Sequence, residues 1–248
     1  MVRDSPRPSA ARFCRALPAW GADVVSSNIV GYEKITLTPG LNMIGNQFLA
    51  VGGDAFKNIN GMFVDSSEMV AGTGDDNADS ILTWNGSSYN KVYYLDDWDN
   101  NWYDSDDANE PSEVVFTPGQ GFWFKHIGDE PITTTLAGEV PSGDSYSVSL
   151  TPGLNFVANP YPMAICPNSE SFMVSGAIAG TGDDNADSIL TWNGSSYNKV
   201  YYLDDWDNKW YDSDDANDPV STTIFNPAMG FWYKHLGEGA TLTFGKPF

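Results

Sequence analysis

Residues 71–109 read AGTGDDNADSILTWNGSSYNKVYYLDDWDNNWYDSDDAN, and residues 179–217 repeat this stretch with a single difference, Asn101 in the first copy and Lys209 in the second. Each copy carries nine Asp and a high density of Trp and Tyr. A long internal repeat marks a structural unit that is used twice, so the sequence predicts two homologous units. Recent gene conversion explains the near-identity of the two copies as well as shared selection does.

The flanking motifs align between the copies at lower identity. TPGLNMIGNQF at 38–48 corresponds to TPGLNFVANPY at 151–161, and FTPGQGFWFKHIG corresponds to FNPAMGFWYKHLG further along each copy. This alignment predicts one β-repeat domain at 23–139 and a second at 140–248. Each is near the size of a small β-sandwich and large enough for its own core.

Charge is distributed unevenly along the chain. All four Arg lie in the first 15 residues, whereas 32 acidic residues and eight Lys follow from Asp23 onward. Such a negative field repels nucleic acid and anionic lipid, so nucleic-acid binding is not expected and cations are the natural partners. The alternative is that an acidic surface simply keeps a secreted protein soluble.

Residues 1–22 have features of a processing segment. They are basic and include Ala19-Trp20-Gly21, which is similar to a small-residue cleavage site, although Arg12 and Arg15 interrupt the apolar run. We expect a degraded or truncated signal segment and therefore an extracellular or cell-surface protein. The two Cys imply no disulfide framework. No later stretch approaches the roughly 18 apolar residues of a membrane span, so membrane insertion is not expected.

Strand signals dominate both units. Residues 32–37 and 146–150 alternate between polar and apolar with period two. Asn85-Gly86 separates two strand-like runs and predicts a hairpin with a tight type I′ turn, and Asn193-Gly194 does the same in the second copy. The two Gly-Phe-Trp segments read as buried strands. The predicted class is all-β, with two homologous β-sandwich-like or partly open barrel domains in tandem.

The order of these motifs carries a resemblance. A Pro-Gly-Leu-Asn turn and strand, an Asp-rich loop with a Trp-Asn-Gly hairpin, and a Gly-Phe-Trp strand follow one another in each copy. This order resembles a poorly characterised tandem β-repeat domain of secreted and surface proteins from environmental bacteria, over nearly all of 26–248. The resemblance implies an exported surface or matrix β-domain and brings no active-site residues with it.

The Asp-rich loops are candidates for a Ca²⁺ site, because this ion prefers six to eight oxygen ligands. Asp75-x-Asn77-x-Asp79 matches the opening of a calcium loop, but Ser80 and Gly86 stand where an EF-hand needs Gly and Glu. We therefore predict a non-EF-hand site, with Asx turns that cap their own backbone as the alternative. The predicted ligands are Asp75, Asn77, Asp79, Asp104, Asp106 and Asp107 in the first copy, and Asp183, Asn185, Asp187, Asp212, Asp214 and Asp215 in the second.

Four tryptophans stand out because they lie in these hydrophilic loops: Trp98, Trp102, Trp206 and Trp210. An indole in such a loop needs something to pack on. It can stack on a sugar ring while neighbouring Asp accept from hydroxyls, or it can close the loop onto its own domain or a neighbouring subunit. We expect these four residues to contact a ligand or partner.

Catalysis has little support. The chain has two His, His126 and His235, one in each unit, and none of the common nucleophile, zinc or phosphate-binding motifs. The many Asp leave a glycosidase-type carboxylate pair as a residual alternative. The sequence therefore predicts an exported acidic protein, stabilised by Ca²⁺, that works by self-association or by binding a surface or matrix partner. A polysaccharide-binding module and a fragment of a larger secreted enzyme are the alternatives.

Overall fold

The computed structural model describes residues 29–52, 57–222 and 224–246, and the predicted signal segment at 1–22 lies outside these ranges. The described residues form β-strands joined by turns, with one short 3-10 helix, η1 (Ile59–Gly61). The predicted all-β class is confirmed. We refer to residues 29–139 as the first half and to residues 140–246 as the second half.

The first half has a five-stranded sheet in the order β2-β8-β4-β5-β6 and two smaller sheets, β1-β9 and β3-β7. All the ladders are antiparallel. The strands are β1 (Val30–Leu37), β2 (Gly40–Gly45), β3 (Lys57–Asn58), β4 (Ser80–Trp84), β5 (Tyr89–Leu95), β6 (Trp102–Asp104), β7 (Val115–Phe116), β8 (Gly121–His126) and β9 (Ile132–Glu139).

The second half has a six-stranded sheet in the order β11-β17-β13-β14-β15-β16 and a three-stranded sheet in the order β10-β18-β12. The strands are β10 (Ser145–Leu150), β11 (Gly153–Ala158), β12 (Phe172–Ser175), β13 (Ser188–Trp192), β14 (Tyr197–Leu203), β15 (Trp210–Asp212), β16 (Asp215–Pro219), β17 (Gly230–His235) and β18 (Ala240–Gly245).

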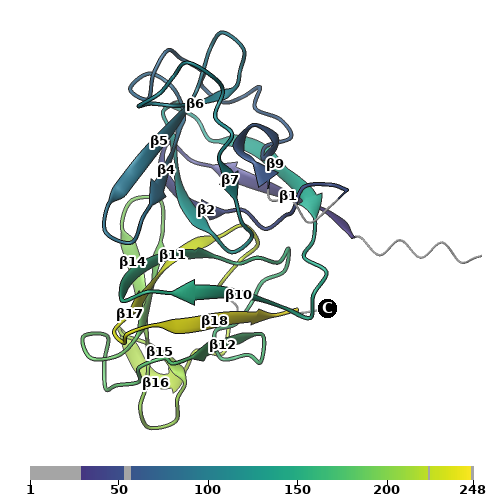
Figure 1. Cartoon of the computed structure of the whole chain (residues 1–248). Coiled ribbons are helices and arrows are strands. Elements are labelled where there is room, and N and C mark those ends of the chain that lie inside the picture. Colours follow the sequence, from purple (N-terminus) through teal and green to yellow (C-terminus); the bar gives the residue numbers. More distant parts are fainter. Residues whose placement is uncertain (1–28, 53–56, 223, 247–248) are drawn as a thin grey trace, which may run out of the picture.

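The two large sheets share their connectivity. β2-β8-β4-β5-β6 corresponds strand for strand to β11-β17-β13-β14-β15, and among the described residues no sheet mixes strands from the two halves. The large and the smaller sheets contribute buried aromatic and aliphatic side chains to one continuous core, which extends through both halves. β6 and β15 lie toward opposite ends of the molecule, and β2 and β11 lie near its middle (Figure 1).

The Gly-Phe-Trp strands are buried on both faces. In β8, Phe122 and Phe124 belong to the sandwich core, whereas Trp123 lies on the other face of the sheet in a second apolar cluster with Trp232. Successive side chains of a strand point to opposite faces, so a strand covered on both sides needs a continuous apolar run. This explains why β8 and β17, which the sequence predicted as buried strands, show no period-two alternation.

The predicted hairpins form, but their turns differ from the expected type. Trp84 pairs with Tyr89, which leaves four residues in the loop. Gly86 has a positive φ of 101°, whereas Asn85 does not have the positive φ that a type I′ turn requires. Instead the Asn85 side-chain oxygen accepts from the backbone amides of Ser87 and Ser88, both at 2.9 Å. The type I′ prediction is wrong because the side-chain hydrogen bonds of Asn favour a wider Asx loop.

Candidate functional site

The two halves meet at a central interface whose contacts occur in both directions. The Trp84 indole Nε1 donates to the Leu154 carbonyl oxygen at 2.9 Å, and the equivalent Trp192 donates to the Leu41 carbonyl oxygen at 2.8 Å. Leu41 and Leu154 occupy the same place in the two Pro-Gly-Leu-Asn motifs. The central interface is therefore reciprocal: each half donates the same hydrogen bond to the other, as in an isologous contact between two subunits.

Aromatic rings pack between these hydrogen bonds. Trp84 meets Trp232 edge-to-face with ring centroids 5.3 Å apart, and Trp192 meets Trp123 in the same way at 5.2 Å. Phe156 lies between the two pairs, 4.3 Å from Trp232 and 5.6 Å from Trp123. Each such pair adds about 0.5–1.5 kcal/mol beyond the apolar area that it buries. The outer faces of the two large sheets therefore cover each other here.

Close backbone approach completes the central interface. The Gly45 amide donates to the Ala228 carbonyl at 3.0 Å, and the equivalent Ala158 amide donates to the Gly119 carbonyl at 2.9 Å. A Cβ built on Gly45 would lie 2.0 Å from the Cβ of Ala158. Gly45 and Ala158 are equivalent residues, and equivalent residues of two halves meet only close to the twofold axis that relates the halves. The space between these two residues holds one methyl group. The first half has a glycine there and the second half an alanine.

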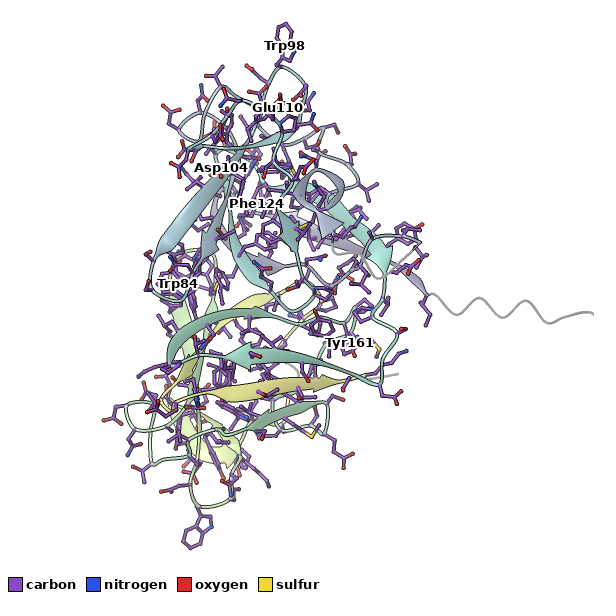
Figure 2. The ribbon with its side chains drawn as sticks, viewed as in Figure 1. Trp84, Trp98, Asp104, Glu110, Phe124 and Tyr161 are labelled. Carbon is purple, nitrogen blue, oxygen red and sulfur yellow. The ribbon has the colours of Figure 1, made fainter. Side chains whose placement is uncertain are left out.

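Trp98 and Trp206 are exposed to solvent, unlike the packed tryptophans of the central interface. Trp98 is 92% exposed and Trp206 is 93% exposed. The Trp98 indole projects from one end of the molecule (Figure 2), and the loop that carries Trp206, between β14 and β15, lies at the other end (Figure 1). The other six tryptophans of the described residues are buried or half-buried. Trp98 and Trp206 are therefore accessible from outside, and their contact with a ligand or partner stays a prediction.

The loops that carry these indoles have a defined backbone. In the first tip loop, residues 96–101, the Trp98 amide donates to Asp96 Oδ1 at 2.9 Å and the Asn100 amide donates to the Asp96 carbonyl at 3.1 Å. Asn100 has a positive φ of 57°. The second tip loop, residues 204–209, repeats these hydrogen bonds within 0.1 Å, at 2.9 and 3.0 Å. Each indole is therefore held out by an ordered turn.

Carboxylates surround each exposed indole. Asp96, Asp97 and Asp99 flank Trp98, and the Asn101 side chain donates to Asp99 Oδ2 at 2.8 Å. This hydrogen bond is the largest of several effects that together hold the pKa of the Asp99 carboxyl below its usual value. In the second tip loop Lys209 replaces Asn101, and its Nζ lies 3.8 Å from Asp207 Oδ2.

Trp102 and Trp210 require a correction, because both are buried. They are 3% and 4% exposed and begin β6 and β15. The Trp102 ring lies 6.0 Å from Phe124 and 5.9 Å from Phe63, inside the core. The left-handed Asn100 ends the tip loop, and the pleat of the short strand that follows points Trp102 inward. These two residues are core residues and not contact residues.

Asp79, predicted as a calcium ligand, is also fully buried. Its carboxylate accepts from the Val70 amide at 3.1 Å and the Ile127 amide at 2.9 Å, and it pairs with His126 Nδ1 at 2.8 Å. Both oxygens are engaged inside the protein, so the prediction that Asp79 binds a metal is wrong. Asp79 directly precedes β4, and β4 lies beside β8, which ends at His126. The pair ties these two strands together.

Asp187 repeats this arrangement with one addition, and its assignment as a calcium ligand is wrong for the same reason. It accepts from the Leu236 amide and pairs with His235 Nδ1, both at 2.9 Å. The Tyr233 hydroxyl also donates to Asp187 Oδ2 at 2.9 Å, whereas the first half has Phe124 at this position. Burial, followed by the Asp187 charge and hydrogen bond, raises the pKa of Tyr233.

The remaining predicted ligands lie in turns or at the ends of the strands β6, β15 and β16. Asn77 Oδ1 accepts from the Gly74 amide at 3.0 Å, and Asp104 Oδ1 accepts from the Asp106 amide at 3.0 Å. Asn185 and Asp212 make the equivalent bonds. These are the Asx turns that the sequence left open as the alternative. Across the described ranges, no three or more His, Cys, Asp or Glu side chains are grouped as a metal site would require. Calcium binding stays a prediction.

The sequence reasoning missed two functional pairs. The reciprocal Trp84 and Trp192 contacts were not expected, although both tryptophans end a hairpin strand in the duplicated block. The Asp79–His126 pair was missed because 47 residues separate its members. The available signal was that one His and one strand-preceding Asp recur together in both copies.

No family model, curated protein or solved structure matches this chain. In the part of the chain that the structure describes, no helix has the length and apolar character needed to cross a membrane. The function therefore has to be inferred from the geometry.

Proposed function

We propose that this chain is an exported, non-enzymatic protein that bridges partners through Trp98 and Trp206. The single observation that carries the proposal is the exposure of these indoles, 92% and 93%, on ordered loops at opposite ends. Burying an indole removes roughly 150–250 Å² from water, a gain of about 4–6 kcal/mol before the costs of association. A partner that covers either tip recovers this energy.

The central interface supports an outward-facing role for the tips. It uses the outer faces of both large sheets, so these faces bind the other half and not an outside partner. The His side chains are 2% and 1% exposed and hold buried carboxylates, so neither reaches a substrate. Two equivalent tips on one particle are suited to bivalent binding, in which the second contact benefits from a high effective concentration.

Calcium belongs to the proposal as a stabiliser of the tip regions. Asp75 and Asp76 are exposed, and their loop is bridged through Gly72 to Asp96 of the first tip loop. Two like charges about 4 Å apart repel each other by about 1 kcal/mol in water. A divalent cation relieves that repulsion.

The alternative is a polysaccharide-binding module, in which the indole stacks on a sugar ring. The observation that favours it is the row of carboxyl groups beside Trp98, whose oxygens can accept hydrogen bonds from sugar hydroxyls. Both candidate functions therefore use the same indole as the contact residue. They differ in whether a protein or a sugar covers it.

The test compares the wild type with Trp98→Ala, Trp206→Ala and the double variant. Binding to a panel of insoluble polysaccharides and concentration-dependent sedimentation are measured for each. We expect the double variant to lose whichever interaction is present, and the two single variants to show whether one tip or both tips carry it. A double variant that matches the wild type in both assays would contradict the proposal.

A further inference from the structure

The two tips are nearly identical, but their surroundings differ. Beside the second tip loop lies a cavity of about 490 Å³, a size typical of sites that bury organic groups. Phe172, Met173 and Val174 of β12 line it on one side, and Lys209 and Trp210 line it on the other. Phe172 and Trp210 lie at its base as core residues that are each only 4% exposed, and the half-exposed Met173 offers apolar surface at its edge.

Lys209 is the single charged residue among those that line this cavity. It is also the one position at which the duplicated blocks differ. Its side chain is 53% exposed, and its 3.8 Å separation from Asp207 is longer than the 2.7–2.9 Å of a strong charged hydrogen bond. A carboxylate that enters from outside can therefore compete with Asp207 for this exposed ammonium group. Asn101 offers no such charge in the first half.

We infer that Trp98 of one copy docks in the cavity beside Lys209 of a second copy. This inference rests on the proposed function, for which it names the partner. The first tip offers an apolar ring flanked by carboxylates, and the cavity offers the exposed Met173 side chain together with the Lys209 ammonium group. The two surfaces are complementary in both hydrophobicity and charge.

The positions of the two surfaces set the form of the assembly. Trp98 lies at one end of the molecule and the second tip loop lies at the other (Figures 1 and 2). A contact between two different surfaces at opposite ends is heterologous, and it leaves one free tip and one free cavity on every assembly. Such contacts build an open head-to-tail chain unless the rotation closes it into a ring.

Net charge opposes this contact. The chain carries a formal charge of −21, and Asp205 and Asp207 lie in the receiving loop. At about 0.15 M salt, charges more than roughly 8 Å apart are largely screened, whereas the close contact between Lys209 and the incoming carboxylates is screened less. Lys209 thus decides whether the cavity accepts the acidic tip.

The experiment is sedimentation velocity of the full chain at physiological salt across a broad range of concentration. Trp98→Ala removes the docking ring and Lys209→Glu reverses the charge at the cavity. Trp206→Ala is the matched control at the position equivalent to Trp98. We expect the wild type to form concentration-dependent multimers, the first two variants to associate about 30-fold more weakly or worse, and the control to associate like the wild type.

Mixing gives a sharper readout. Trp98→Ala retains the cavity and Lys209→Glu retains the docking ring, so the two variants together should form a discrete heterodimer that neither forms alone. Wild-type protein that stays monomeric at all concentrations overturns the inference, and so does association that depends equally on Trp206. Monomeric protein that still binds polysaccharide through Trp98 and Trp206 overturns the docking alone, whereas loss of both activities overturns the proposed function as well.

Discussion

Trp84 and Trp98 lie 14 residues apart in the same duplicated block, and the protein uses them in opposite ways. Trp84 donates to the other half and packs against Trp232 at the central interface, whereas Trp98 is 92% exposed at the end of the molecule. The same contrast holds for Trp192 and Trp206. Because one tryptophan of each pair is packed inside the protein and the other is exposed, we propose that the exposed ones are where outside partners bind.

The largest expected effect is a difference in unfolding free energy between an alanine substitution at a buried tryptophan and one at a tip tryptophan. Trp123→Ala removes a ring that is 3% exposed and packs against Trp192 and Phe156, so we expect a loss of about 3–5 kcal/mol in the free energy of unfolding. Trp98→Ala should change it by less than about 0.5 kcal/mol. Urea unfolding measures both. Equal losses at the two sites would remove the contrast.

The next effect tests the axis between the halves. Gly45→Ala places a second methyl group 2.0 Å from Ala158 Cβ, so the backbones must separate at a cost of about 1–3 kcal/mol. The double variant Gly45→Ala with Ala158→Gly restores a single methyl group and should recover most of that stability. Thermal unfolding of the three variants gives the coupling between the two positions. Additive losses would show that the residues do not face each other.

The symmetry of the central interface can be measured directly. Trp84→Phe and Trp192→Phe each remove one indole donor and leave a carbonyl without it, at a cost of about 1–2 kcal/mol. Because the two contacts are equivalent, we expect the two losses to agree within about 0.5 kcal/mol in urea unfolding. A variant that costs nothing while its counterpart costs the full amount would contradict a reciprocal interface.

A smaller effect on stability comes from the Tyr233 hydroxyl, which hydrogen-bonds the buried Asp187 and has no counterpart at the buried Asp79. The pKa of Tyr233 is raised in the folded state, so the protonated phenol stabilises the fold below about pH 10, and this contribution falls as the pH rises above that value. Tyr233→Phe should therefore cost about 1 kcal/mol at pH 8 and less at pH 11. Phe124→Tyr, at the equivalent position, is the comparison variant. A cost that grows with pH would reverse the sign of this account.

The smallest effect concerns calcium at the tips. We expect Ca²⁺ to raise the melting temperature slightly and EDTA to lower it, by an amount equivalent to about 1 kcal/mol or less, because the exposed carboxylates repel one another. Asp75→Asn with Asp183→Asn should reduce the difference. Identical melting curves in Ca²⁺ and EDTA would leave the Asx turns as the whole explanation of these loops.

Local patterns in the sequence predicted the all-β class and the exposed tips. Trp98 was identified because an indole among Asp97, Asp99 and their neighbours has no nearby apolar residue to pack on. Trp102 was misassigned because its strand, β6, has three residues, which is too short to show a period of two. The turn at Asn100, which separates the two tryptophans, depends on a left-handed backbone that sequence alone does not reveal.

Long-range pairings could not be read from the sequence. Asp79 meets His126 because β4 and β8 are neighbours in a sheet whose strand order is not written in the chain. Trp84 meets Leu154 because the outer face of one large sheet covers the other, and an apolar residue on such a face has no local sign of its partner. The duplicated sequence alone does not predict that its two copies pack against each other.

Fluorine NMR of protein labelled with 5-fluorotryptophan tests the role of the tips most directly, because it reports every indole in one spectrum. As the protein concentration rises, or as a bound polysaccharide is added, the Trp98 and Trp206 signals should shift or broaden while those of Trp84 and Trp192 stay fixed. Tip signals that remain sharp and unmoved under every condition in which the protein binds or associates would contradict the assignment of these tryptophans as its contact residues.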